Sequence, residues 1–216
     1  MEIDTIVNLL RKNTAQYTQP LIDIIIDEYG KDAYLILIGC LLSLRAKDST
    51  TIHVCRDLFK RAKTVDQMLL LPRQELEKIV FKTGFYKNKA RVVHDVSTEI
   101  KHRFGGKVPE TYEELISIKG VGPKTANLVL GLAFGKPAIC VDTHVHRISN
   151  RLGLIKTKTP EQTEEALKKI LPKKYWTSWN KYLVIWGQNI CVPISPKCSM
   201  CVLNKLCKRV GVTKSR

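Results

Sequence analysis

Four cysteines near the C-terminus have the spacing of a metal-binding loop. Six, two and five residues separate successive thiols of Cys191, Cys198, Cys201 and Cys207. Four thiolates on one loop can hold a zinc ion or an iron–sulfur cluster. Zinc sites more often use two close pairs, whereas this loop has a single C-x2-C, so the residues alone leave both metals open.

A glycine-containing turn is the second candidate site. Lys119, Gly120, Val121 and Gly122 lie between two stretches of helical periodicity, and Pro123 follows where a helix would begin. A turn this tight needs backbone angles that glycine adopts at low cost. It also exposes backbone amides at a helix start, which favours binding of one phosphate of a nucleic-acid backbone. A plain helical hairpin is the alternative.

Two ionisable residues close to this turn could do chemistry on a bound nucleic acid. Lys124 would be the second residue of the helix, where the positive helix end and burial against DNA disfavour its charged form. A neutral amine can attack a sugar carbon or form a Schiff base. Asp142 precedes another expected helix. The alternatives are a solvated lysine that contacts phosphate and an aspartate that only caps a helix.

The charge distribution also favours nucleic acid. The 216 residues carry a formal net charge of +16, from 36 Lys and Arg against 20 Asp and Glu. Residues 166–216 contain eleven basic and no acidic side chains. Phosphates are the usual partner of such a block. A solvated basic face is the alternative, and an acidic membrane surface is less favoured because no lipidation motif accompanies the charge.

Helical periodicity extends over almost the whole chain and predicts an all-α protein. Apolar residues recur at helical spacing within 3–10, 21–25 and 35–42. Further helices are expected at 48–61, capped by Asp48, and at 64–70, 73–82, 87–104, 111–118, 123–134, 143–152, 161–170 and 174–189. The longest apolar run, 33–44, is too short to span a bilayer, and the N-terminus lacks the features of a secretory signal. We therefore expect an intracellular protein without a membrane span.

Other chemically conspicuous residues are expected in the core. The apolar neighbours of three cysteines and the helical spacing of three tryptophans predict buried positions for Cys40, Cys55, Cys140, Trp176, Trp179 and Trp186.

The segment Leu115–Leu152 carries a resemblance to a known family. It reads LISIKGVGPKTANLVLGLAFGKPAICVDTHVHRISNRL and resembles the endonuclease III family of helix–hairpin–helix DNA glycosylases. The resemblance continues through the cysteine loop. It implies a two-lobed fold, with a six-helix lobe at 22–137 and a discontinuous lobe of 1–21 and 138–216 that carries a [4Fe–4S] cluster on loop 191–207.

The resemblance also implies roles for individual residues. Lys124 falls on the position of the family's catalytic lysine and Asp142 on that of its catalytic aspartate, and the two are expected to face each other where the lobes meet. The four cysteines of the loop fall on the ligands of the [4Fe–4S] cluster. The folded loop would present Lys197 and Lys205 to the DNA backbone.

Two further segments match the positions where the family inserts side chains into DNA. Chemistry on a paired nucleotide requires extruding it, and the gap must be filled. Arg45 and Phe85 occupy these positions. Bacterial relatives usually carry glutamine at the position of Arg45 and often carry leucine at the position of Phe85. Arg45 could hydrogen-bond the orphaned base with a preference for guanine, and Phe85 could act as a wedge. The alternatives are a phosphate contact for Arg45 and core packing for Phe85.

These observations predict a monomeric base-excision repair enzyme. It would remove oxidised pyrimidines from double-stranded DNA and cut abasic sites through a lysine Schiff base, as a bifunctional glycosylase and AP lyase. One alternative is a monofunctional glycosylase for a mismatch or uracil. The other is a non-catalytic DNA-binding module with zinc in the cysteine site.

Overall fold

The computed structural model describes residues 3–216 and shows a helical protein with no β-strand among them, which confirms the all-α prediction. The chain forms two compact units. Unit 1 combines the described N-terminal residues up to Gln19 with Pro137–Arg216, and unit 2 is Pro20–Lys136. Within residues 3–216, no helix is both long and apolar enough to cross a bilayer.

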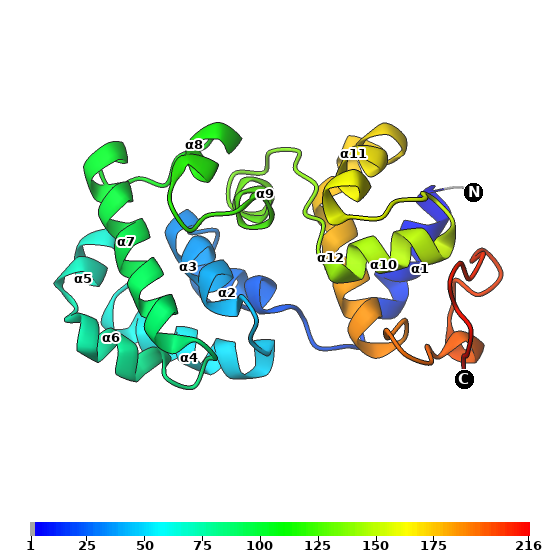
Figure 1. The fold of residues 1–216 in the computed structure, drawn as a ribbon, viewed down its shortest axis with the longest axis horizontal. Helices are drawn as coiled ribbons and strands as arrows, with labels where there is room; N and C mark the ends of the chain where they lie inside the picture. The colour runs from blue at the N-terminus through cyan, green and yellow to red at the C-terminus, as the bar shows by residue number, and fades with distance from the viewer. Residues whose placement is uncertain (1–2) are drawn as a thin grey trace. The chain divides into compact units, whose positions relative to one another are not determined.

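Unit 2 is described throughout and contains eight helices (Figure 1). Six have eight or more residues, and α5 and α8 have six each. The helices are α2 (Leu21–Tyr29), α3 (Ala33–Ser43), α4 (Asp48–Arg61), α5 (Val65–Leu70), α6 (Arg73–Val80), α7 (Tyr86–Phe104), α8 (Tyr112–Ser117) and α9 (Pro123–Leu132).

Helix α3 is the centre of unit 2. It is apolar on all sides, which is typical of a helix surrounded by others, and it packs against α2, α4, α7 and α9. Gly39 permits the close approach of α2, since a Cβ at this position would lie 2.4 Å from Ile25 Cδ1. The α3 framework thereby supports α9, the helix that follows the glycine turn.

Unit 1 is built around α12. Its elements are α1 (Ile3–Thr14), α10 (Thr143–Leu152), α11 (Pro160–Ile170), the 3₁₀ helix η1 (Lys173–Tyr175), α12 (Trp176–Asn189) and the 3₁₀ helix η2 (Cys198–Met200). Helices α1 and α10, from distant parts of the sequence, both pack on α12 (Figure 1). Trp179 and Trp186 are almost completely buried and Trp176 packs against the same core, as predicted.

Most helix boundaries lie close to those expected from the periodicity, and α10 has the bounds expected for 143–152. The prediction that Asp48 caps its helix is wrong. Lys47 is the N-cap residue of α4, and Asp48 Oδ2 instead accepts a hydrogen bond from the Leu21 amide at 3.2 Å. The reason is a tertiary contact. The N-cap residue of α2 makes no side-chain hydrogen bond, and the Asp48 carboxylate accepts from the first amide of that helix instead. The helix expected at 174–189 begins as the 3₁₀ turn η1.

Candidate functional site: helix starts and cysteine loop

The glycine turn joins α8 to α9 as a helix–hairpin–helix. Gly120 has φ +102°, a conformation that L side chains rarely adopt. A Cβ at this position would also lie 2.9 Å from Val92 Cγ1 on α7. Gly120 is therefore required both by the backbone conformation and by the close approach of α7.

Two of the four amides in the turn are available to a ligand. The Lys119 amide donates to Glu99 Oε1 at 3.1 Å, and the Val121 amide donates to the Ile118 carbonyl at 3.0 Å. The amides of Gly120 and Gly122 have no acceptor among residues 3–216, and α9 begins without a side-chain cap. Exposed amides at a positive helix end form an anion site.

Lys124 lies directly beside these amides. It follows Pro123 in the first turn of α9, and its side chain is exposed. The charge of Lys124 also acts on the buried thiol of Cys40 in α3. Burial raises the pKa of this thiol, the positive charge of Lys124 opposes the rise, and the resulting pKa is about 12. An exposed amine next to exposed backbone amides could reach the sugar of a strand whose phosphate those amides held.

Asp142 caps α10 in unit 1. Its Oδ1 accepts hydrogen bonds from the amides of His144 and Val145, both at 2.9 Å. The capping function proposed from the sequence is thus present. Both bonds use one oxygen, and the structure shows no hydrogen bond to Oδ2 within residues 3–216, so this oxygen can act on a substrate.

Arg45 and Phe85 lie together in unit 2. The Arg45 guanidinium carbon is 5.9 Å from the centre of the Phe85 ring, and both residues line a cavity of about 280 Å³. Their φ angles of +53° and +59° are unusual for residues other than glycine. Phe85 is 65% exposed, which excludes the core-packing alternative. An exposed aromatic ring held by a strained backbone can insert between bases.

The cysteine loop follows α12. Cys191, Cys198, Cys201 and Cys207 line one cavity. Burial raises the pKa of the Cys201 and Cys207 thiols, and the Trp186 side chain lowers that of Cys201. Among residues 3–216, no group of three or more His, Cys, Asp or Glu side chains is arranged so that it could hold a metal ion.

Two arginines that sequence analysis missed anchor this loop to α10. Arg147 donates twice to the Cys191 carbonyl, at 3.2 and 2.8 Å. Arg151 donates to the carbonyls of Val192 at 2.8 Å and Pro193 at 2.6 Å. The two arginines are four residues apart on one helix face, and this spacing was the only available sequence signal. Helix α10 therefore carries Asp142 at its start and holds the cysteine loop along its length.

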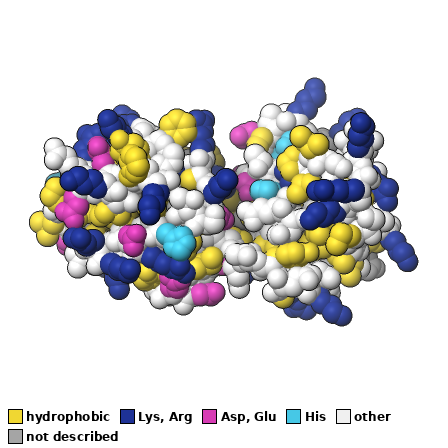
Figure 2. All heavy atoms as spheres, turned by 90° about the horizontal axis from the view of Figure 1, so that it is seen from below, with side chains coloured by type: hydrophobic (Ala, Val, Ile, Leu, Met, Phe, Trp, Pro, Cys, Tyr) yellow, Lys and Arg dark blue, Asp and Glu magenta, His cyan; other side chains and the backbone are white. Residues whose placement is uncertain are grey.

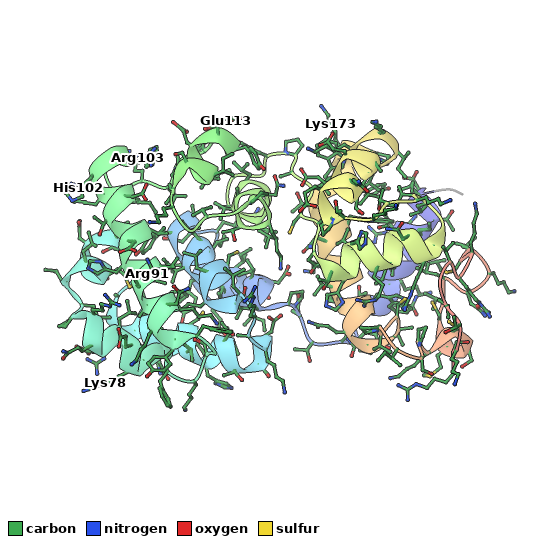
Figure 3. The ribbon with its side chains drawn as sticks, viewed as in Figure 1. Lys78, Arg91, His102, Arg103, Glu113 and Lys173 are labelled. Atoms are coloured by element: carbon green, nitrogen blue, oxygen red, sulfur yellow. The ribbon has the colours of Figure 1, made fainter. Side chains whose placement is uncertain are left out.

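The basic side chains of the loop differ in exposure. Lys205 is exposed and Lys197 is half-buried. On the face drawn in Figure 2, Lys and Arg side chains are scattered over both units. In unit 2, Arg91 and Arg103 on α7, which are labelled in Figure 3, form ion pairs with Asp95 and Glu99.

His146 has a structural position. Its Nδ1 lies 2.6 Å from the Thr163 hydroxyl and links α10 to α11. This contact gives His146 a role in packing α10 against α11.

Comparison with known proteins finds a family match over most of the chain. Residues 38–173 match the HhH-GPD superfamily of base excision DNA repair proteins. Endonuclease III of Thermotoga maritima is 43% identical over 177 residues, which cover 82% of this chain and 83% of that protein.

Solved structures give the same result. A trapped endonuclease III–DNA covalent intermediate with an estranged adenine matches with a TM-score of 0.79 and 31% identity, covering 97% of both chains. A thermostable thymine-DNA glycosylase matches with a TM-score of 0.81 and 25% identity, covering 95% of this chain and 93% of that one. Since two enzymes of different names match the fold equally well, the distinction between them must come from individual residues.

Proposed function

This chain belongs to the endonuclease III family within the HhH-GPD superfamily of base excision DNA repair proteins, and we propose that it is a bifunctional DNA glycosylase and AP lyase acting on oxidised pyrimidines in double-stranded DNA. The observation that carries this proposal is the start of α9. An exposed lysine stands there beside two unoccupied amides, in a turn built to accept a phosphate.

DNA binding begins at the turn. The amides of Gly120 and Gly122 donate to one phosphate, and the positive end of α9 adds a sequence-independent attraction. The side chain of Lys119 is exposed beside them. This contact holds the strand so that the sugar next to the phosphate comes within reach of Lys124.

The reaction requires an ionised carboxylate and a neutral amine. As the bond between the damaged base and C1′ breaks, positive charge develops on the sugar, and the Asp142 carboxylate stabilises it. The Lys124 amine forms a new bond to C1′, and the ring opens to a Schiff base. Loss of a C2′ proton then expels the 3′ phosphate and cuts the strand. Hydrolysis of the Schiff base finally releases the enzyme.

Arg45 and Phe85 serve the extrusion step in this proposal. Phe85 is exposed and enters the base stack, and the Arg45 guanidinium donates to the base left without a partner. An arginine donor favours guanine at that position.

The cysteine loop fits a [4Fe–4S] cluster. The four thiols line one cavity, and thiolates are the ligands that such clusters use. The cluster would cross-link a loop that has little regular structure, since the 3₁₀ helix η2, which begins at the second ligand, is only three residues long. The loop folded in this way would present the side chains of Lys197 and Lys205 to the DNA backbone.

The test is a panel of duplexes with single lesions, in which base release and strand cleavage are measured separately. The expected result is release of oxidised pyrimidines with coupled cleavage, and borohydride should trap a covalent protein–DNA species. Base release without cleavage or trapping on every duplex would establish the monofunctional alternative. The thymine-DNA glycosylase match makes this comparison necessary.

Two measurements distinguish the proposed enzyme from the alternative of a non-catalytic DNA-binding module with zinc in the cysteine site. An iron–sulfur cluster gives visible absorbance and iron and sulfide on analysis, whereas d¹⁰ zinc is colourless. Colourless protein with stoichiometric zinc, together with no cleavage of an abasic duplex, would replace the enzyme assignment by that of a binding module.

A further inference from the structure

The cavity beside Arg45 and Phe85 contains two further polar side chains that the proposed reaction does not use. It has a volume of about 280 Å³, lies within unit 2, and is walled in part by apolar side chains of α3 and α7. Asn88 and Lys89 line it together with Arg45 and the exposed Phe85 ring. Small-molecule pockets have volumes of about 300–1,000 Å³, so a cavity near the lower end of this range suits a ligand as small as one nucleobase.

Two of the polar side chains in this cavity have no acceptor. Lys89 Nζ is buried and has no hydrogen-bond partner among residues 3–216. In the same part of the chain, the Arg45 guanidinium contacts the Phe85 ring but makes no hydrogen bond or ion pair. None of the side chains that line the cavity is acidic. Since donors without acceptors are unfavourable, the cavity favours a ligand that supplies acceptors.

The third polar side chain, Asn88, is held in one orientation by an arginine of the same helix. Arg91 Nη2 donates to Asn88 Oδ1 at 2.7 Å, and Arg91 Nη1 donates to Asp95 Oδ2 at 3.5 Å. A guanidinium has donors only, so the Asn88 atom that faces it must be the amide oxygen. The NH2 group of Asn88 has no acceptor within residues 3–216. The cavity therefore presents side-chain donors, and its one amide oxygen is engaged by Arg91.

A lining of donors distinguishes guanine from adenine. On its major-groove edge guanine presents two acceptors, N7 and O6, whereas adenine presents the N7 acceptor beside the N6 donor. An asparagine that is free to use both ends of its amide suits adenine, because it donates to N7 and accepts from N6. Because Arg91 engages its oxygen, Asn88 can only donate, and this fits guanine better than adenine.

We propose that this cavity binds the base left without a partner when the damaged nucleotide is extruded, with Asn88 as a specificity-determining residue and Arg91 as the residue that positions it. The inserted Phe85 ring stacks against that base, and Arg45 and Asn88 share the two acceptors of guanine. This inference rests on the DNA repair reaction given under Proposed function and adds a second residue that contacts the orphaned base. Guanine should therefore be preferred opposite the lesion, and adenine should be disfavoured by the orientation of Asn88.

The experiment measures binding of the full-length protein to four duplexes. Each contains tetrahydrofuran, an abasic-site analogue that the lyase reaction does not cut, opposite guanine, adenine, cytosine or thymine. Asn88→Asp removes the donor at almost constant shape, and Arg91→Leu releases the Asn88 oxygen. Arg103→Leu is the matched control, because Arg103 is another ion-paired arginine of α7 and does not line the cavity.

The expected result is a preference for guanine that depends on the orientation of Asn88. Wild type and Arg103→Leu should bind the guanine duplex about tenfold more tightly than the adenine duplex. Asn88→Asp and Arg91→Leu should each lose most of this difference, and Arg91→Leu should do so mainly by binding the adenine duplex more tightly. Replacing the guanine by 7-deazaguanine, which lacks the N7 acceptor, should weaken binding by wild type but hardly by Asn88→Asp.

Other outcomes overturn the inference. A guanine preference that persists in both Asn88→Asp and Arg91→Leu would show that Asn88 does not contact the orphaned base. Equal weakening of all four duplexes by Asn88→Asp would place Asn88 on the DNA backbone instead. Wild-type protein that cuts damaged DNA but binds the four duplexes equally would overturn this inference alone. Protein that neither releases bases nor cuts abasic DNA would overturn the proposed function, whatever its preference among the four duplexes.

Discussion

The starts of α9 and α10 show two opposite uses of a helix N-terminus. Helix α9 begins without a side-chain cap, and in the part of the chain that the structure describes the neighbouring amides of Gly120 and Gly122 have no acceptors. Helix α10 begins with Asp142, whose Oδ1 satisfies two amides. The open start suits binding of an external anion, and the closed start fixes the orientation of a carboxylate. Local stability is given up at the first and gained at the second.

The two units also differ in charge. Unit 1 holds 17 Lys and Arg against 6 Asp and Glu, and unit 2 holds 19 against 14. Unit 1 therefore supplies more of the non-specific attraction to DNA, although the open helix start lies in unit 2. In the proposed reaction each unit contributes a different property: general electrostatic attraction and the carboxylate in unit 1, and specific phosphate contact and the amine in unit 2.

The largest effect is expected from Lys124→Gln at the open helix start. Strand cleavage and borohydride trapping should fall at least about a thousandfold, because the amine that forms the Schiff base is lost and the glutamine amide is not nucleophilic. DNA affinity should change little, since one charge contributes about one unit to the salt dependence. Cleavage at the wild-type rate would refute the assignment of Lys124.

At the start of α10, substitutions of Asp142 can separate the catalytic role of its carboxylate from its role as a helix cap. Asp142→Asn should lower base release by roughly 10²–10⁴-fold, because the negative charge is lost. Its melting temperature should stay close to that of the wild type, since asparagine caps helices about as well as aspartate.

The matched variant Asp142→Ala should lose the same activity and, in addition, about 1 kcal/mol of unfolding free energy. Thermal or denaturant unfolding of the two variants measures this difference. If Asp142→Asn were as unstable as Asp142→Ala, or as active as the wild type, the two roles would not be separable at this residue.

The glycine turn offers a pair of alanine substitutions. Gly120→Ala should destabilise the protein by about 1–3 kcal/mol, because its φ is +102° and Val92 Cγ1 would lie 2.9 Å from the new Cβ. Gly122→Ala should cost less, about 1 kcal/mol at most, because its φ is −95° and its Cβ would meet nothing within 4 Å, so only the preference for glycine over alanine at the N-cap is lost. Unfolding by denaturant tests both. Equal destabilisation would mean that the turn is not held in the observed conformation.

The smallest effect is expected from the exposed loop residue Lys205. Lys205→Gln should weaken binding uniformly across DNA sequences and reduce the slope of log affinity against log salt by about one. Binding to undamaged duplex at several salt concentrations measures this slope. An unchanged slope would remove Lys205 from the DNA contacts and shift the attraction of unit 1 to its other basic residues.

Local features of the sequence predicted local structure well. The periodicity of α10 located both ends of this helix, and Asp142 was identified as a possible cap from its position before a helix. The tight turn at Gly120 followed from residue type alone, because few other residues adopt its φ. These features depend on neighbours within one turn of the chain.

Long-range contacts were not accessible in this way. Asp48 bonds to the Leu21 amide rather than capping its own helix, and Arg147 reaches the Cys191 carbonyl 44 residues away. Nothing in the local pattern indicates that Phe85 would be 65% exposed beside Arg45.

The sequence by itself determined the helices, the glycine turn, the basic balance and the residue types available for chemistry, because these depend on backbone preference and short-range periodicity. The tertiary structure decided which amides stay open and which carboxylate oxygen is engaged. Packing brings distant groups together, and burial makes each unpaired donor or acceptor costly, so the pairing of polar groups is settled only when the whole fold is formed.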